Sequence, residues 1–281
     1  MSDERSTRFN SLVEIMFLGR KLADDLMAPE ACQAANSISC ALAERMTSAI
    51  PRFLPEAHPD SQDRVVTMHD LSQCIERAGH NLEYAVKLVF ETPQVQETMS
   101  LWRTFSFEYV NALRKIMMGA LCSKLRTYLP SSEQVAMNVQ SEINRFLAVL
   151  HRRTKSAILK LIQCNRRPFT MRIDELKEYT ARFEQDHLAA SAYLSCAKPD
   201  ADDQTAYKEQ IHVMAEVHAY LNIMCSRTCD TVVRAAWCEL WDGFAHNFGD
   251  RIMDKASDLV DRPSEWQAYG GMDGEVFNEE A

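Results

Sequence analysis

The sequence predicts an all-α fold, an elongated antiparallel bundle of long helices. Glycine and proline are scarce, with 8 and 9 copies among 281 residues, and strong helix formers such as Ala, Leu and Glu are frequent. Apolar residues recur at steps of three and four, the period of an amphipathic helix. No tract alternates with period two over a useful length, so no sheet is expected. Long helices that pack side by side give a bundle.

Two helices are expected at the start of the chain, over residues 1–27 and 30–50. Apolar residues that recur along the first helix are Phe9, Leu12, Val13, Met16, Phe17, Leu22 and Leu26. Those that recur along the second are Ile38, Leu42, Met46 and Ile50. Three prolines, Pro51, Pro55 and Pro59, then predict an irregular connector, because proline lacks a backbone donor and restricts the residue before it.

The next two helices are expected over residues 64–91 and 93–129, with Gly79 as a weak point in the first. Thr92 fits an N-cap with Pro93 at the first helical position. The apolar residues that recur along the second of these helices are Val95, Met99, Trp102, Phe105, Tyr109, Leu113, Ile116 and Met117.

Three further helices are expected over residues 132–164, 173–195 and 204–248, followed by a short one over 251–260. The apolar seam of the 204–248 helix consists of Ile211, Met214, Val217, Leu221, Met224, Thr228 and Val232. The glycine-rich acidic tail after Pro263 has the composition of a disordered segment.

Charge and cysteine usage narrow the classes of function. The formal net charge is −9, which disfavours binding to nucleic-acid phosphates. The local basic cluster Arg152, Arg153 and Lys155 is either a solvated helix side or a patch for peripheral contact with an anionic membrane. The polar N-terminus, the lack of a membrane-spanning run and nine scattered cysteines predict a reduced, cytoplasmic protein whose cysteines are small core residues.

No sequence pattern predicts a catalytic, cofactor or metal site. Cys225 and Cys229 share a helix face, with His212 and His218 nearby, and this spacing is open to a metal site or to a seam of small residues. The neighbours His69 and Asp70 are weak evidence for acid–base chemistry. A further set of aromatic residues is expected in the core, or on an interaction surface if nothing covers it: Trp237, Trp241, Phe244 and Phe248.

Three segments carry a resemblance to a known family. Residues 166–170 read RRPFT after a long helix, 213–220 read VMAEVHAY, and 227–232 read RTCDTV. In this order and spacing they resemble the C-terminal half of dynamin-related GTPases, especially the fungal dynamin-like group. Residues 259–263 echo the end of that region. The resemblance covers about 155–263 and extends more weakly over 64–154.

The resemblance implies a stalk and a GTPase effector region that assemble with copies of themselves or with full-length dynamin-related GTPases in membrane remodelling. The phosphate-binding pattern GxxxxGK[ST] is absent from the sequence, so no enzymatic activity is expected. His218 stands where the family usually has arginine. Candidate assembly and packing residues are Arg167, Pro168, Phe169, Met214, Val217, Tyr220, Leu221, Arg227, Asp230, Trp237 and Trp241.

The resemblance also predicts how the chain is divided. Residues 1–60 form an unassigned helical segment, 61–165 a stalk-like region, 166–262 an effector-like region and 263–281 the tail. Three alternatives stay open: a C-terminal fragment or degraded paralogue of a dynamin-like GTPase without independent activity, an unrelated helical interaction protein, and a helical enzyme that uses cysteine or metal chemistry.

Overall fold

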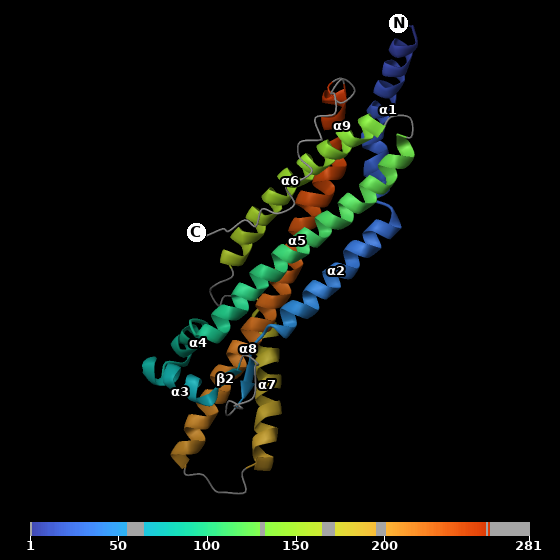
Figure 1. The fold of residues 1–281 in the computed structure, drawn as a ribbon. Coiled ribbons are helices and arrows are strands. Elements are labelled where there is room, and N and C mark those ends of the chain that lie inside the picture. Colours follow the sequence, from blue (N-terminus) through green and yellow to red (C-terminus); the bar gives the residue numbers. More distant parts are fainter. Residues whose placement is uncertain are drawn as a thin grey trace. The chain divides into compact units, whose positions relative to one another are not determined.

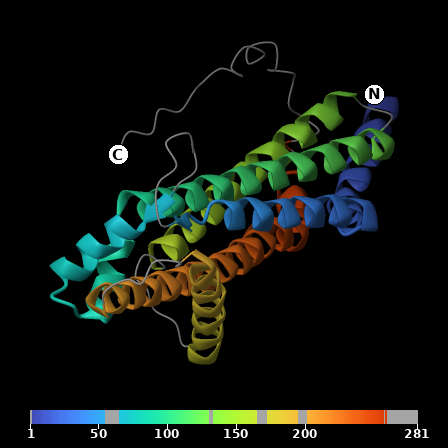
Figure 2. The same cartoon turned by 90° about the horizontal axis from the view of Figure 1, so that it is seen from below.

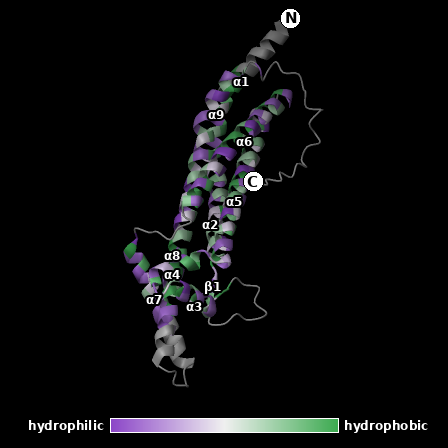
Figure 3. Cartoon of the chain, turned by 90° about the vertical axis from the view of Figure 1, so that its left-hand side faces the viewer, coloured by the Kyte–Doolittle hydropathy of each residue, from purple (hydrophilic) through white to green (hydrophobic). Residues whose placement is uncertain are grey.

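The computed structural model describes residues 2–54, 65–129, 133–164, 172–194, 201–256 and 258. It confirms the all-α class, because long helices that pack against one another make up most of the described chain (Figure 1). Hydrophobic and hydrophilic residues share the surface of each helix, as an amphipathic pattern requires (Figure 3). The antiparallel order of the whole bundle stays a prediction.

Five of the predicted helices have bounds within about two residues of those expected from periodicity and capping. They are α1 (Ser2–Leu26), α2 (Pro29–Ser48), α5 (Pro93–Tyr128), α6 (Glu133–Cys164) and α7 (Ile173–Leu194). Pro93 begins α5 as predicted, but the Thr92 hydroxyl donates backward to the Val89 carbonyl at 2.7 Å. Thr92 therefore closes the preceding helix with its side chain.

The single helix predicted over 64–91 is wrong. The chain forms β2 (Val65–Thr67), α3 (Met68–Arg77) and α4 (Leu82–Phe90). Thr67 starts α3 through a reciprocal capping box with Asp70. Gly79 and His80 then both take left-handed φ angles, 60° and 62°, which no α-helix accommodates.

The expectation of no sheet is also wrong in one place. Strand β1 (Arg52–Leu54) pairs in parallel with β2 over three residues, with Phe53 opposite Val66. Both central side chains are buried. The short tract escaped the period-two criterion because three residues are too few to show alternation.

The long C-terminal helix predicted over 204–248 is interrupted. Helix α8 (Ala201–Ala236) is followed by the π-helical turn η1 (Trp237–Asp242) and by α9 (Gly243–Asp254). Residues 251–254 of the short helix predicted over 251–260 belong to α9, which ends at Asp254. Ala256 and Asp258 are again helical, and 257, 259 and 260 lie outside the described residues. The irregular connector predicted from Pro51, Pro55 and Pro59 is wrong over Arg52–Leu54, which form β1. Its remainder over 55–64 and the tail after Pro263 lie outside the described residues.

Contacts divide the chain into two compact units, each built from separated stretches. Unit 1 comprises residues 1–36, 111–154 and 236–281, and unit 2 comprises 37–110 and 155–235. The sequence divisions at 60, 165 and 262 follow chain order, and they stay predictions about modules of the chain.

In unit 1, α1 packs along α9 (Figure 1). Their backbones approach closely, because a Cβ built on Gly19 would lie 2.6 Å from the Cα of Gly249. The buried stripe of α1 is Ile15, Leu18, Leu22 and Leu26. Val13 and Phe17, expected on that stripe, are 36% and 63% exposed, so this part of the predicted stripe is wrong.

In unit 2, α8 has a long buried apolar seam. All seven residues of its predicted seam are buried, which confirms that expectation: Ile211, Met214, Val217, Leu221, Met224, Thr228 and Val232. Helix α5 contributes the buried Trp102, whose indole N–H donates to the Met46 carbonyl of α2 at 2.8 Å. Thr98 likewise donates to the Ala49 carbonyl at 2.9 Å.

Candidate interaction surface

The predicted assembly residues on α8 split between core and surface. Met214, Val217 and Leu221 are almost fully buried within unit 2. Tyr220 is half-buried and meets Phe90 of α4 edge-on, with ring centroids 6.2 Å apart. The apolar half of the VMAEVHAY segment therefore builds the core of its own chain and is not available to a partner.

The polar members of the predicted set lie nearer the solvent. Arg227 is half-buried and Asp230 is exposed, three residues apart on α8. In unit 1, Trp237 is half-buried and Trp241 is fully buried, with ring centroids 4.8 Å apart. The remaining predicted residues, Arg167, Pro168 and Phe169, lie outside the described residues.

The aromatic set after Trp237 is core. Phe244 and Phe248 have no exposed surface, and their rings stack at 4.4 Å between centroids. Both also pack on Phe146 of α6, at 5.8 Å and 6.0 Å. Of the two expectations for this set, packing within the chain is the one that holds for Trp241, Phe244 and Phe248.

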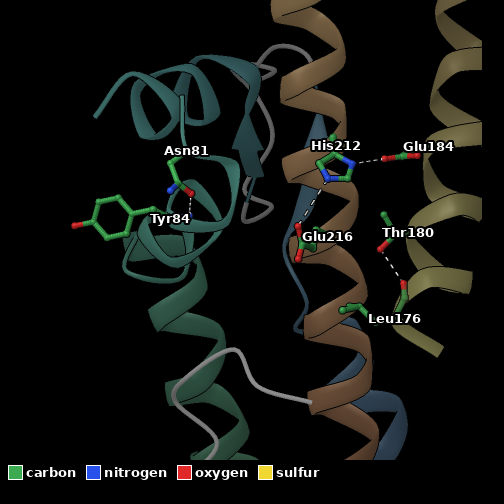
Figure 4. Close-up of polar contacts among 7 residues, drawn as sticks. All are labelled: Asn81, Tyr84, Leu176, Thr180, Glu184, His212 and Glu216. Atoms are coloured by element: carbon green, nitrogen blue, oxygen red, sulfur yellow. Dashed lines mark hydrogen bonds and ion pairs between the residues drawn. The ribbon is translucent and has the colours of Figure 1, made fainter. Parts of the chain in front are cut away.

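A polar cluster connects α8 to α7 (Figure 4). The Nδ1 of His212 lies 2.7 Å from Oε1 of Glu184 on α7, and its Nε2 lies 4.0 Å from Oε2 of Glu216 on α8. Burial raises the pKa of Glu216, His212 acts in the opposite direction, and Glu83 raises it further. The imidazole thus lies between a carboxylate of α7 and a carboxylate of α8.

An aromatic cluster fixes α7 beside the same helix. Phe183 lies 4.6 Å from the His218 ring between centroids, and Phe53 of β1 approaches both rings edge-on at 6.3 Å and 6.0 Å. No side chain over residues 173–186 of α7 is buried. His218 therefore serves as a packing surface for Phe183 and Phe53.

The surroundings of the two α8 cysteines favour their interpretation as small residues of the apolar seam over their interpretation as metal ligands. Cys225 and Cys229 are buried, and the Cys225 Sγ lies 3.9 Å from the Thr47 hydroxyl of α2. Burial raises the pKa of Cys225 to about 11, the Thr47 hydrogen bond lowers it and Cys229 raises it. Across the described residues, no three His, Cys, Asp or Glu side chains are placed to hold a metal ion.

The expectation that cysteines are core residues holds only in part. Cys74 is buried like the pair on α8, but Cys40, Cys164 and Cys238 are exposed. None of the described cysteines forms a disulfide. Their helical periodicity could not separate buried from exposed positions, because cysteine is small enough for either.

In unit 1, helices α5 and α6 form a helical hairpin that hydrogen bonds connect to α1 and α9. The Arg114 guanidinium donates to the Asn144 side-chain oxygen at 2.6 Å, and the His151 ring lies 2.7 Å from the Asn111 side-chain oxygen. Because the partner's number on α6 rises as the number on α5 falls, the helices run antiparallel here, and they lie side by side (Figure 2). Glu142 of α6 is 1% exposed and accepts from Arg251 of α9 at 2.6 Å and from Lys255, the residue after α9, at 3.1 Å. At the closed end, Tyr128 donates to Asp25 of α1 at 2.6 Å.

The hairpin carries two adjoining hollows of about 300 and 410 Å³ that share Met137 and Gln140. They form one groove between α5 and α6. Its walls and floor are lined by Met118, Cys122, Leu125, Arg126, Leu129, Glu133, Ala136, Met137, Gln140, Ser141 and Asn144. The methionines and small residues of the groove suit contact with another protein surface.

No protein-family model matches the sequence, and no curated protein matches it. None of the described helices has a stretch both long and apolar enough to span a membrane.

Sequence reasoning missed the residues that join elements far apart in the chain. Glu142 and Arg251 are 109 residues apart, and Glu184 and His212 are 28 residues apart. A glutamate on the apolar face of α6, between Val139 and Ile143, was the signal available for Glu142. A groove leaves no such signal, because its shape depends on which helices pair.

Proposed function

We propose that this chain is a non-catalytic assembly module that associates with copies of itself and with full-length dynamin-related GTPases, and that it acts in membrane remodelling through such partners. One observation carries the proposal. The dynamin-like segment of α8 buries its apolar residues Met214, Val217 and Leu221 in its own core and leaves the polar Arg227 and Asp230 nearer the solvent. This division is expected of a helix that stabilises a stalk and presents a polar edge to a partner.

Exposed apolar side chains give further support. In unit 1, Phe17 of α1 and Met253 of α9 are 63% and 49% exposed. In unit 2, Ile173 of α7 is 56% exposed. Single exposed apolar residues are ordinary in monomers, so these residues add support only together with the α8 segment.

Size-exclusion chromatography with light scattering over a range of protein concentrations tests the proposal. We expect a mass above that of the monomer, rising with concentration, and capture of a full-length dynamin-related GTPase by the immobilised chain. An Asp230→Lys variant should reduce that capture, while Asp254→Lys at the exposed end of α9 should not. A strict monomer that ignores full-length relatives would contradict the proposal.

A further inference from the structure

The groove of the α5–α6 hairpin has a fixed register. The Arg114–Asn144 hydrogen bond and the 2.7 Å contact between His151 and Asn111 pair the two antiparallel helices level by level. One turn nearer the closed end, Met118 on α5 faces Gln140 and Ser141 on α6 across the first hollow. The groove is thus a sequence of paired levels with residues from α5 on one wall and from α6 on the other.

In the second hollow, the same register places Cys122 of α5 opposite Met137 of α6, and Arg126 of α5 opposite Glu133 of α6. Arg126 and Glu133 are both exposed. Across the described part of the chain, neither side chain has an ion-pair partner within 4.0 Å, and neither bridges the groove to the other. One lip of the groove therefore has a cation and the opposite lip an anion, and neither is in an ion pair within the described residues.

This arrangement is self-complementary. A two-fold axis that runs along the groove places the α5 wall of one copy over the α6 wall of the other at the same level. In such an isologous contact, residue i of one copy meets residue j of the other, and j meets i. Arg126 of each copy then faces Glu133 of the other, so one contact forms the same ion pair twice.

The middle of the groove suits the same contact. Met118 and Met137 are flexible and polarisable, and they can fill an irregular space between two copies. Leu125 and Ala136 provide an apolar floor. The hydrogen bonds of Tyr128 to Asp25 and of Arg251 to Glu142 fix α5 to α1 and α6 to α9. Little conformational ordering of the two groove helices is therefore required when a second copy binds.

We infer that the groove between α5 and α6 is a dimerisation surface, occupied by the same groove of a second copy related by a two-fold axis and paired through Arg126 and Glu133. This inference rests on the proposed function, since it identifies the surface through which the chain associates with itself. Electrostatic complementarity of this kind selects the partner and its orientation.

Charge reversal tests it with the full-length chain in sedimentation equilibrium. Arg126→Glu and Glu133→Arg should each weaken homodimerisation by about tenfold or more, because each creates two like-charge pairs. The double variant Arg126→Glu/Glu133→Arg restores both pairs and should dimerise like the wild type. An equimolar mixture of the two single variants should form heterodimers, since every pair across the axis is again of opposite sign.

The control variant is Arg153→Glu, which makes the same change in net charge as Arg126→Glu on an exposed part of α6 beyond the groove. It should dimerise like the wild type, and circular dichroism melts should show all variants folded. If the wild type associates but the single variants do so equally well, the groove assignment is overturned and the proposed function stands. If the wild type never associates, both self-association and the groove are overturned.

Discussion

At the residue scale, burial makes the Cys225 thiol unreactive. A pKa of about 11 in place of 9.0 lowers the thiolate fraction at mildly alkaline pH by about 100-fold, and the thiolate is the nucleophile. We expect iodoacetamide to alkylate Cys225 at least about 100-fold more slowly than the exposed Cys164. Mass spectrometry after trypsin measures both, because cleavage at Arg227 separates Cys225 from Cys229.

The same experiment in denaturant is the control. Unfolding removes the burial that raises the pKa, so Cys225 and Cys164 should then react at similar rates. Alkylation of Cys225 in the native protein at the rate of Cys164 would show that the side chain is accessible, and it would contradict the packing of α8 on α2. Such a result would also reopen the cysteine-chemistry alternative.

At the element scale, the crossing of α1 and α9 depends on a glycine. A Cβ at Gly19 would meet the Gly249 Cα at 2.6 Å, a backbone atom that cannot rotate away. Gly19→Ala should therefore lower the free energy of unfolding by about 1–3 kcal/mol, as overpacking does. Urea denaturation followed by circular dichroism measures this change.

Gly249→Ala is the matched control, because a Cβ built there has nothing within 4 Å. Alanine is the better helix former, so this variant should be as stable as the wild type or gain about 0.5–1 kcal/mol. Equal destabilisation by both substitutions would mean that the helices do not cross as described. Close packing predicts that alanine lowers the free energy of unfolding at Gly19 and not at Gly249. A general effect of alanine would change it equally at both positions.

The elements also show how far sequence reasoning reaches. Periodicity located five helices and the whole seam of α8, because both depend on residues near one another in sequence. Periodicity failed where left-handed backbone angles interrupt a helix, as at Gly79 and His80. It also failed where a three-residue strand pairs with a distant strand, as at Phe53. Of the six predicted assembly residues on α8, the three aliphatic ones, Met214, Val217 and Leu221, proved to be core, since an apolar stripe does not reveal what covers it.

At the scale of the whole molecule, the two compact units are each assembled from stretches far apart in the chain. Helices α2, α5 and α6 each contribute residues to both units. A division of the sequence into consecutive segments cannot anticipate this, because helix periodicity shows which face is buried and not which helix buries it. The groove between α5 and α6 is hidden from the sequence for the same reason.

Net charge governs how the whole molecule meets a membrane. The chain carries −9, while the basic cluster offers only Arg152 and Arg153 as exposed cations. The ammonium of Lys155 lies 5.2 Å from the Phe107 ring centroid, which holds it against its own unit. Two cations near an anionic surface contribute about 2 kcal/mol, and the long-range field of the remaining acidic groups opposes that attraction.

We therefore expect no co-sedimentation of the chain alone with phosphatidylserine-rich vesicles at physiological salt, and no change on Arg152→Glu/Arg153→Glu substitution. The cluster is then the solvated side of α6, and the proposed action in membrane remodelling would require a membrane-bound partner. Vesicle binding by the wild type that the double substitution abolishes would assign the cluster to lipid. Binding that survives the substitution would place the lipid contact elsewhere and would contradict the argument from net charge.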